Sequence, residues 1–260
     1  MTVHFYKYQG TGNDFIILDN RENSLHLTDE TVAKLCHRRF GIGADGLMLL
    51  GRDHHYDFSM KYYNSDGREG SMCGNGGRCM VSFANSLGLI GKKTRFMAVD
   101  GVHEAEVTAE EYVKLRMSDV DGIRAEQDHY FLNTGSPHAV LFVEDVNSLK
   151  IVERGREIRY SNAFQPGGTN VNFVQVLDRN TLYVRTYERG VEDETLSCGT
   201  GVTASSLAAS LKLNADNSSF NIRTLGGNLV VSFTKLPEGR FNGITLEGPA
   251  KRVFEGEYTL

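Results

Sequence analysis

The pattern of hydrophobic and polar residues predicts strands interrupted by a few helices. Residues 170–176 and 181–187 are rich in Val, Thr, Tyr and Phe, which favour strands. Two segments instead place small and apolar residues at helical spacing: Cys79, Met80, Phe83, Ala84 and Leu87 before Gly88, and Ala204, Leu207, Ala208 and Leu211. The second segment has small residues on all sides, which predicts a buried helix. Residues 29–38 predict a third, amphipathic helix with Thr28 as its N-cap.

The chain also contains one internal repeat. Thr11-Gly12-Asn13 before an apolar run recurs about 124 residues later as Thr134-Gly135-Ser136. Other pairs recur in the same order at nearly the same offset, including Tyr63-Asn64 with Tyr187-Glu188, and Cys73-Gly74-Asn75-Gly76 with Cys198-Gly199-Thr200-Gly201. We therefore expect an α/β (α+β) protein of two pseudo-symmetric domains that face each other, each a mostly antiparallel sheet or barrel around a central helix. The boundary is expected near residues 120–122, giving domains 1–120 and 121–249.

Composition and charge exclude several classes of function. The net charge of -5 provides no basic surface for nucleic acid. The N-terminus does not look like a secretory signal, and no apolar segment approaches the roughly 20 residues of a membrane helix. Four cysteines without an export signal favour reduced thiols in the cytoplasm. No phosphate-binding glycine loop and no lysine suited to a pyridoxal Schiff base is present, so we expect no cofactor.

Two cysteines carry the candidate chemistry. Cys73 and Cys198 lie where a glycine-rich turn meets a predicted helix N-terminus, whose amides and dipole favour a thiolate and bind a carboxylate. If the two copies face each other, both thiols reach one substrate from opposite sides. Inversion of a stereocentre needs this arrangement, because one thiolate removes an α-proton while the other thiol delivers one. The amides that would hold the reacting carboxylate belong to Gly74, Asn75, Gly199 and Thr200.

Other titratable residues admit two interpretations. Cys36 and Cys79 are expected in the core, and a zinc site of Cys73 with Cys79 is disfavoured because no second pair of ligands lies nearby; we predict no metal site. His138 follows Pro137 and is either a turn histidine or a group that polarises a thiol. Glu188 either acts similarly on the opposite cysteine or forms a surface ion pair with Arg189. His54-His55 is expected in a solvated loop.

Seven motifs together resemble one known family. They are Gly12-Asn13-Asp14-Phe15, Gly41-Ile42-Gly43-Ala44-Asp45-Gly46, Tyr63-Asn64-Ser65-Asp66-Gly67, Cys73-Gly74-Asn75-Gly76-Gly77-Arg78-Cys79, Gly135-Ser136-Pro137-His138, Tyr187-Glu188-Arg189-Gly190 and Cys198-Gly199-Thr200-Gly201. They span the chain and closely resemble diaminopimelate epimerase. Ser136 differs from this family, because many relatives have Asn before the Pro-His pair.

The resemblance implies a function and a set of site residues. It implies a cofactor-independent epimerase that interconverts LL- and meso-diaminopimelate for lysine and peptidoglycan synthesis. Cys73 and Cys198 would be the acid and base, and His138 and Glu188 would activate them. The predicted substrate contacts are Asn13, Asn64, Gly74, Asn75, Ser136, Asn170, Glu188, Arg189, Gly199 and Thr200. The family's last strand crosses back to the first domain, so residues 250–260 would complete it. Homodimerisation is also expected, with Phe254 where some relatives carry a Tyr at the dimer contact.

Two other functions remain open at this point. A related two-cysteine racemase could act on proline, hydroxyproline or histidine, although Asn64, Asn170 and Arg189 favour a substrate with a polar, anionic distal end. A non-catalytic amino acid binding protein would explain an amide-lined cleft. It would not explain two thiols in equivalent places.

Overall fold

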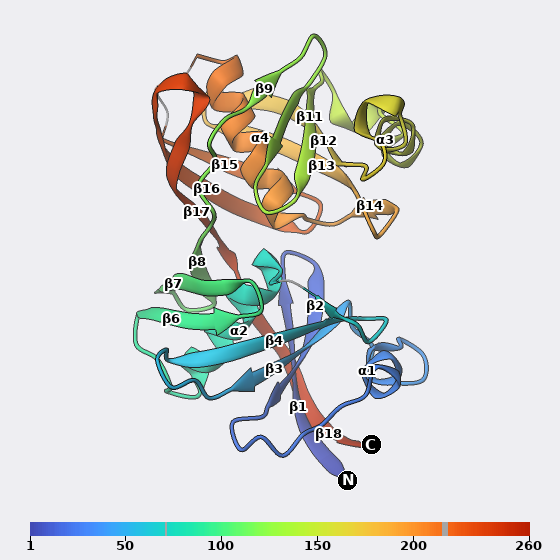
Figure 1. Cartoon of the computed structure of the whole chain (residues 1–260), viewed down its shortest axis with the longest axis vertical. Helices are drawn as coiled ribbons and strands as arrows, with labels where there is room; N and C mark the ends of the chain where they lie inside the picture. Colours follow the sequence, from blue (N-terminus) through green and yellow to red (C-terminus); the bar gives the residue numbers. More distant parts are fainter. Residues whose placement is uncertain (71, 215–217) are drawn as a thin grey trace. The chain divides into compact units, whose positions relative to one another are not determined.

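The computed structural model covers the whole chain and describes residues 1–70, 72–214 and 218–260. It divides into two compact units, of which unit 1 comprises Met1–Leu115 with Gly248–Leu260 and unit 2 comprises Arg116–Glu247. Both units are mixed α/β structures, mostly sheet with few helices (Figure 1). Among the described residues, no helix combines the length and apolar character needed to cross a membrane.

Unit 1 is built from nine strands and two helices within its described residues. The strands are β1 (Thr2–Gly10), β2 (Asn13–Asp19), β3 (Gly46–Gly51), β4 (Phe58–Asn64), β5 (Glu69–Gly70), β6 (Lys93–Ala98), β7 (Gly101–Ala109), β8 (Tyr112–Arg116) and β18 (Lys251–Thr259). The helices are α1 (Asp29–Cys36) and α2 (Gly74–Ser86). The C-terminal strand β18 pairs antiparallel with β1, so the end of the chain belongs to this unit.

Unit 2 has the same number of strands and α-helices among its described residues. Its strands are β9 (Arg124–Ala125), β10 (Tyr130–Asn133), β11 (Pro137–Phe142), β12 (Asn170–Asp178), β13 (Thr181–Glu188), β14 (Asp193–Thr195), β15 (Ser219–Thr224), β16 (Gly227–Lys235) and β17 (Phe241–Pro249). Its α-helices are α3 (Ile151–Arg159) and α4 (Gly199–Lys212), and short 3-10 turns occur at Val146–Ser148, Asn162–Phe164 and Pro237–Gly239. The last two residues of β17 fall in unit 1.

Strand pairing follows the same order in the two units. In unit 1 the order is β18, β1, β2, β3, β4, β6, β7 and β8, with parallel pairing only between β2 and β3 and between β4 and β6. In unit 2 the order is β9 to β13, then β15 to β17, with parallel pairing at the corresponding two places. These pairings are those of the described residues. The expectation of a mostly antiparallel sheet is confirmed for each unit.

Each sheet curves around one buried helix. Helix α2 contacts β1, β2, β3, β7 and β18, while α4 contacts β10, β11, β12, β13, β15 and β16. Gly199 and residues 201–210 of α4 are all buried, as expected for a helix of small and apolar residues. Burial on every side fixes the position of the helix N-terminus within its unit. Each unit is therefore a sheet wrapped around a central helix.

One predicted helix needs correction, and one helix was not predicted. Helix α1 ends at Cys36 rather than residue 38, because His37 already has extended backbone. Thr28 caps its start as predicted, accepting a hydrogen bond from the Thr31 amide at 3.3 Å. Helix α3 was not predicted; its sequence is strongly charged, and only Ile151 and Gly155 are buried.

Candidate active site

The two candidate cysteines occupy equivalent positions in the two units. Cys73 is the N-cap residue of α2, and Cys198 is the N-cap residue of α4. The carbonyl of each accepts the first helical hydrogen bond, from Gly77 N at 2.7 Å and from Val202 N at 2.9 Å. The backbone amides of the first turn precede that bond and lie at the positive end of the helix dipole. Each unit thus places a thiol beside a set of donors suited to an anion.

The remaining two cysteines are structural, as predicted. Cys36 is 3% exposed and Cys79 is fully buried. Burial raises the pKa of each of these thiols to about 12, so both are neutral at pH 7. Among the described residues there is no group of three or more His, Cys, Asp or Glu side chains that could hold a metal ion. His54 and His55 are exposed, as expected of a solvated loop.

In unit 2, Cys198 lies beside a buried histidine. Of the two interpretations of His138, the turn histidine is wrong, because His138 is the second residue of β11 and is fully buried. Its Nε2 is 2.9 Å from Thr200 Oγ1 and 3.0 Å from Ser136 Oγ. Thr200 Oγ1 is in turn 3.4 Å from Cys198 Sγ. Burial, and next the charge of Arg189, lower the pKa of His138 to about 3, so the ring is neutral.

Asn170 joins this group to the loop after β13. Its Nδ2 donates to the Pro137 carbonyl at 2.9 Å and to Ser136 Oγ at 3.2 Å. Its Oδ1 accepts from the backbone amide of Arg189 at 2.8 Å, which leaves the exposed guanidinium at the loop surface. Glu188, the last residue of β13, accepts from Thr195 Oγ1 at 2.9 Å. Unit 2 therefore brings most of its predicted site residues together around the start of α4.

In unit 1, a chain of amides leads from the loops to α2. Asp45 Oδ2 accepts from Asn13 Nδ2 at 3.0 Å, and Asn13 Oδ1 accepts from Asn75 Nδ2. Asn75, on the first turn of α2, is only 1% exposed. Asn64 stands apart from this chain at the end of β4, where it is exposed and its Nδ2 lies 3.5 Å from the Arg68 carbonyl of its own turn.

A buried arginine lies behind the start of α2. Arg78 is fully buried, and its guanidinium donates to Asn75 Oδ1 at 3.0 Å, to Thr11 Oγ1 at 3.2 Å and to the Gly74 carbonyl at 3.3 Å. Its Nε has no hydrogen-bond partner within the part of the chain that the structure describes. Burial lowers the pKa of Arg78, while the neighbouring Cys79 and Cys73 oppose that shift. Arg78 therefore interacts electrostatically with Cys73 as well as with the neutral Cys79.

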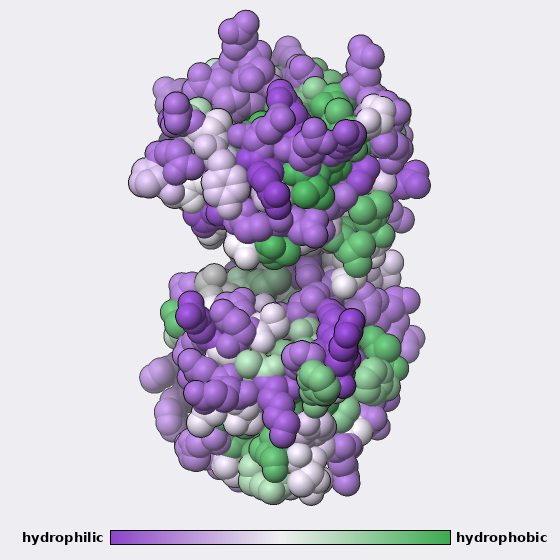
Figure 2. Space-filling view, turned by 90° about the vertical axis from the view of Figure 1, so that its right-hand side faces the viewer, coloured by the Kyte–Doolittle hydropathy of each residue, from purple (hydrophilic) through white to green (hydrophobic). Residues whose placement is uncertain are grey.

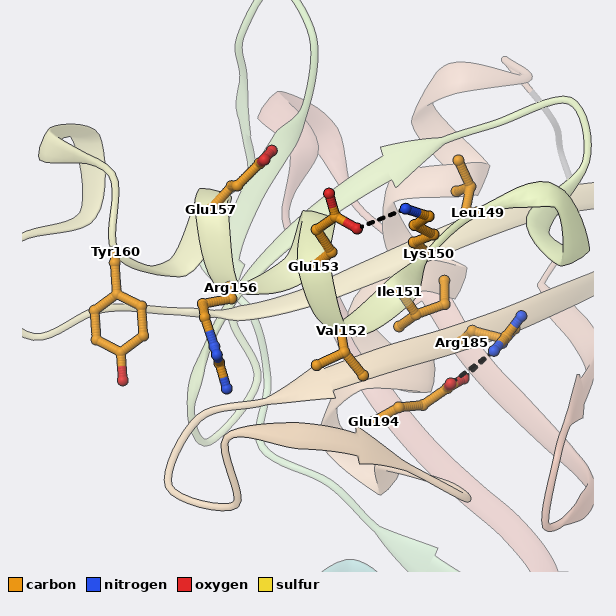
Figure 3. Close-up of a pocket in the computed structure, with 10 residues that line it drawn as sticks. All are labelled: Leu149, Lys150, Ile151, Val152, Glu153, Arg156, Glu157, Tyr160, Arg185 and Glu194. Atoms are coloured by element: carbon orange, nitrogen blue, oxygen red, sulfur yellow. Dashed lines mark hydrogen bonds and ion pairs between the residues drawn. The ribbon is translucent and has the colours of Figure 1, made fainter.

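A cavity of about 790 Å³ in unit 2 lies away from this chemistry. Its lining comes from α3 and the residues that flank it, and from the strands β13 and β14 (Figure 3). Four of its charged side chains form ion pairs with each other, Lys150 with Glu153 at 3.1 Å and Arg185 with Glu194. The cavity holds none of the predicted site residues, so we do not assign it to the active site.

Comparison with known proteins identifies the family. The family model described as "Diaminopimelate epimerase" matches residues 5–122 and 130–253. Diaminopimelate epimerases from Flavobacterium psychrophilum and Chlorobaculum tepidum are 49% and 45% identical to this chain, over 97% and 96% of it and 99% of each relative. The chain belongs to the diaminopimelate epimerase family. It is therefore an isomerase.

Solved structures agree with this assignment at the level of fold. A PhzF-family protein of Bacillus anthracis matches over the full length of both chains, with a TM-score of 0.79 and 14% identity. A hydroxyproline epimerase from Agrobacterium vitis matches 100% of this chain and 93% of its own, with a TM-score of 0.69 and 15% identity. The diaminopimelate epimerase family thus shares its fold with other proteins at low sequence identity.

Sequence reasoning about this diaminopimelate epimerase family member missed two polar residues. Arg78 was quoted only as part of a motif, although a charge among the core positions of a predicted buried helix was a usable signal. Asn172 was not singled out, although it stands between Val171 and Phe173 in an otherwise apolar strand and is fully buried. A polar residue on a predicted buried face needs a partner, and both residues have partners that reach the start of a central helix.

Proposed function

We propose that this chain interconverts LL- and meso-diaminopimelate, with Cys73 and Cys198 as the two acid–base groups and without a metal or organic cofactor. The observation that carries the proposal is the equivalent placement of the two thiols at the N-termini of the central helices. A stereocentre is inverted when a proton leaves one face and another proton arrives at the opposite face. Two thiols in pseudo-symmetric positions suit this requirement.

The remaining roles follow from the chemistry of the substrate. The α-proton of an amino acid is weakly acidic, so the carboxylate beside it must be held by preorganised donors. We assign this task to the first-turn amides of Gly74, Asn75, Gly199 and Thr200. Asn13, Asn64, Asn170 and Arg189 would bind the substrate largely at its distal amino acid end, and Ser136 would be a further substrate contact. Glu188 and His138 would tune the thiols.

We also propose that the chain forms a homodimer through β18. Residues 251–255 are all exposed, so neither face of this part of the strand is covered within the unit. Val253 is 56% exposed and Phe254 is 48% exposed. The face of the molecule in Figure 2 is mainly hydrophilic with scattered hydrophobic groups. Exposed apolar residues on a strand favour a contact with a second copy of the chain. A Phe254→Arg variant should sediment as a monomer if the contact is correct.

The proposed setting is the cytoplasm, where thiols stay reduced and diaminopimelate serves lysine and peptidoglycan synthesis. Two reduced acid–base thiols require such a compartment. An oxidising compartment would convert the thiols to oxidised forms such as sulfenic acids or disulfides.

The reaction is tested by α-proton exchange. The reduced protein is incubated with LL-diaminopimelate in deuterium oxide without added cofactor, and the loss of the α-proton and formation of the meso isomer are followed by NMR. Cys73→Ala and Cys198→Ala should each lower the rate of inversion by about 10³-fold or more, since positioned acid–base groups contribute roughly that much. Inversion that survives either substitution would contradict the two-thiol mechanism.

Substrate choice is tested at Arg189. Removal of a charged partner of a substrate carboxylate should cost roughly 1.5–3 kcal/mol, so Arg189→Leu should raise KM for diaminopimelate by about 10- to 100-fold. Gly167, whose carbonyl accepts from Arg189 at 3.3 Å, offers a control, because Gly167→Ala leaves the guanidinium in place. Unchanged KM in Arg189→Leu, with exchange on proline or hydroxyproline, would favour a racemase of another amino acid. No exchange on any amino acid would favour a binding protein.

A further inference from the structure

The side chain of Asn172 makes three hydrogen bonds inside unit 2. It is fully buried on β12. Its Oδ1 accepts from Thr186 Oγ1 at 3.0 Å, and its Nδ2 lies 3.3 Å from the Ala139 carbonyl and 3.0 Å from His138 Nδ1. A backbone carbonyl only accepts, so the amide nitrogen must be the atom that faces Ala139 and His138. The orientation of the side chain is therefore fixed by its neighbours.

This orientation determines which nitrogen of His138 carries the proton. An amide NH₂ group only donates, so His138 Nδ1 must accept and keep its lone pair. A neutral imidazole then has its hydrogen on Nε2. The low pKa of His138 agrees with a neutral ring. His138 consequently faces Thr200 and Ser136 as a hydrogen-bond donor.

The direction of hydrogen bonding continues to Cys198. Thr200 Oγ1 is 2.9 Å from His138 Nε2 and accepts its hydrogen. Ser136 Oγ, at 3.2 Å from Thr200 Oγ1, already accepts from Asn170 Nδ2 and so can direct its own hydrogen to Thr200 as well. The hydroxyl of Thr200 has one hydrogen, and Cys198 Sγ lies 3.4 Å from its oxygen. A hydroxyl that accepts from two donors directs this hydrogen to the sulfur.

We propose that Asn172 is a positioning residue that holds His138 as the Nε2–H imidazole, so that the Thr200 hydroxyl donates a hydrogen bond to the Cys198 thiolate. The use of that thiolate in epimerisation rests on the proposed function, whereas the hydrogen-bond chain does not. No proton moves along the chain. As Cys198 gives up or takes the α-proton, the hydrogen bond from Thr200 to its sulfur becomes stronger or weaker. His138 therefore acts as a donor through Thr200 and not as the base that deprotonates Cys198.

The tautomer is tested directly by NMR on the full chain without substrate. The protein is labelled with ¹⁵N-histidine, and His138 is assigned among the eight histidines by its loss in His138→Gln. The wild type should show a lone-pair nitrogen at Nδ1 and a protonated Nε2 at pH 7. In Asn172→Asp the new carboxylate accepts a hydrogen bond, so Nδ1 should become protonated. An unchanged His138 signature in Asn172→Asp would overturn the proposal.

Thr186→Val is the matched control. It removes the hydroxyl that donates to Asn172 Oδ1 but keeps the amide nitrogen on His138. This variant should lose stability and retain the wild-type tautomer. A changed tautomer in Thr186→Val as well would mean that general packing, and not the Asn172 amide, sets the state of His138.

The effect on sulfur is tested by alkylation. Iodoacetamide labelling at pH 7 is followed by mass spectrometry of the Cys73 and Cys198 peptides separately. Thr200→Val should slow labelling of Cys198 by about 5- to 20-fold and leave Cys73 unchanged, and Thr200→Ser should restore the rate. Equal labelling of Cys198 in Thr200→Val and the wild type would overturn the proposal, even if Asn172→Asp failed to fold.

Activity provides a separate readout. Asn172 does not touch the substrate in the proposed function, so Asn172→Asp should lower kcat and leave KM within about twofold of the wild type. The NMR and alkylation experiments need no substrate. An inactive wild type with the predicted tautomer would therefore refute the proposed function and leave the hydrogen-bond chain standing.

Discussion

The first turns of α2 and α4 pack on equivalent strands, but α2 contacts apolar side chains there and α4 contacts polar ones. A Cβ atom added at Gly76 would lie 3.1 Å from Met48 Sδ and 3.7 Å from the Phe15 ring. At the equivalent position in unit 2, a Cβ atom added at Gly201 would collide with Asn172 Oδ1. Phe15 and His138 each occupy the first position of the parallel pairing of their strands, and Met48 and Asn172 each occupy the third. The apolar pair Phe15 and Met48 in unit 1 thus corresponds to the hydrogen-bonded pair His138 and Asn172 in unit 2.

On the helices themselves, the polar group with a charge belongs to unit 1 and the neutral one to unit 2. Arg78 of α2 donates to the Gly74 carbonyl at 3.3 Å, and the equivalent Thr203 of α4 donates to the Gly199 carbonyl at 2.9 Å. Unit 1 therefore places a buried cation behind its thiol, and unit 2 places a chain of neutral donors. A thiolate at a helix N-cap can be favoured by a nearby charge, as at Arg78, or by a hydrogen bond, as proposed from Thr200. The pseudo-symmetry of the fold does not extend to the groups that support the two sulfurs.

The largest effect that sharpens this comparison is expected at Arg78. Arg78→Met removes the buried charge and keeps a long apolar side chain. Labelling of Cys73 by iodoacetamide at pH 7 should slow by about 10-fold or more, because a charge in a poorly solvated site contributes on the order of 1–2 kcal/mol or more to a nearby anion. Labelling of Cys198 should not change. The two rates are read from the separate peptides by mass spectrometry.

Thr203→Val is the matched variant in unit 2. It alters the same helix position without removing a charge, so both labelling rates should stay near the wild type. If Arg78→Met folds, as judged by circular dichroism, and Cys73 reacts at the wild-type rate, the cation does not support that thiol and the comparison fails.

The next largest effect is expected on the stability of variants at the two equivalent helix glycines, Gly76 and Gly201. Gly201→Ala must displace an amide fixed by three hydrogen bonds, so the free energy of unfolding should fall by about 2–3 kcal/mol. Gly76→Ala meets the flexible side chain of Met48, and Ala favours the helix by up to about 1 kcal/mol, so its cost should lie between about 0 and 1 kcal/mol. Urea denaturation of the two variants measures the difference. Equal costs would show that the two strands support their helices in the same way.

Much of this architecture could be predicted from particular residues. The repeated Cys-Gly-x-Gly turns predicted both central helices and the thiols at their starts, because glycine spacing and apolar periodicity are local signals. The sequence could not show that His138 is buried on a strand, since Pro137 before it is typical of a turn as well as of an edge. The tautomer of His138 depends on Asn172, which lies 34 residues away in sequence. Such long-range partners have no local signature.

The smallest expected effect concerns how stability depends on pH through one acidic residue in each unit, Asp14 in unit 1 and Glu192 in unit 2. In unit 1, burial would raise the pKa of Asp14, but hydrogen bonds from Arg38 and Lys7 lower it to about 2. In unit 2, hydrogen bonds from Arg159 lower the pKa of Glu192 to about 2 against the opposing effect of burial. In the unfolded chain both carboxyl groups titrate near 4. Between about pH 4 and pH 2 the unfolded chain therefore binds more protons than the folded protein does.

The sign of the pH effect follows from this difference. Stability from both carboxylates is fully present above about pH 4.5 and is lost as the pH falls toward 2. Arg38→Met in unit 1 and Arg159→Met in unit 2 should each reduce the loss of unfolding free energy between pH 7 and pH 3 by about 1 kcal/mol, since both pairs are partly solvated. Arg52→Met is the control, because Arg52 pairs with Glu22 on an exposed surface. Urea denaturation at the two pH values gives the comparison. If the Arg38 and Arg159 variants lose the same stability as the wild type on acidification, these ion pairs do not account for the acid sensitivity of the fold.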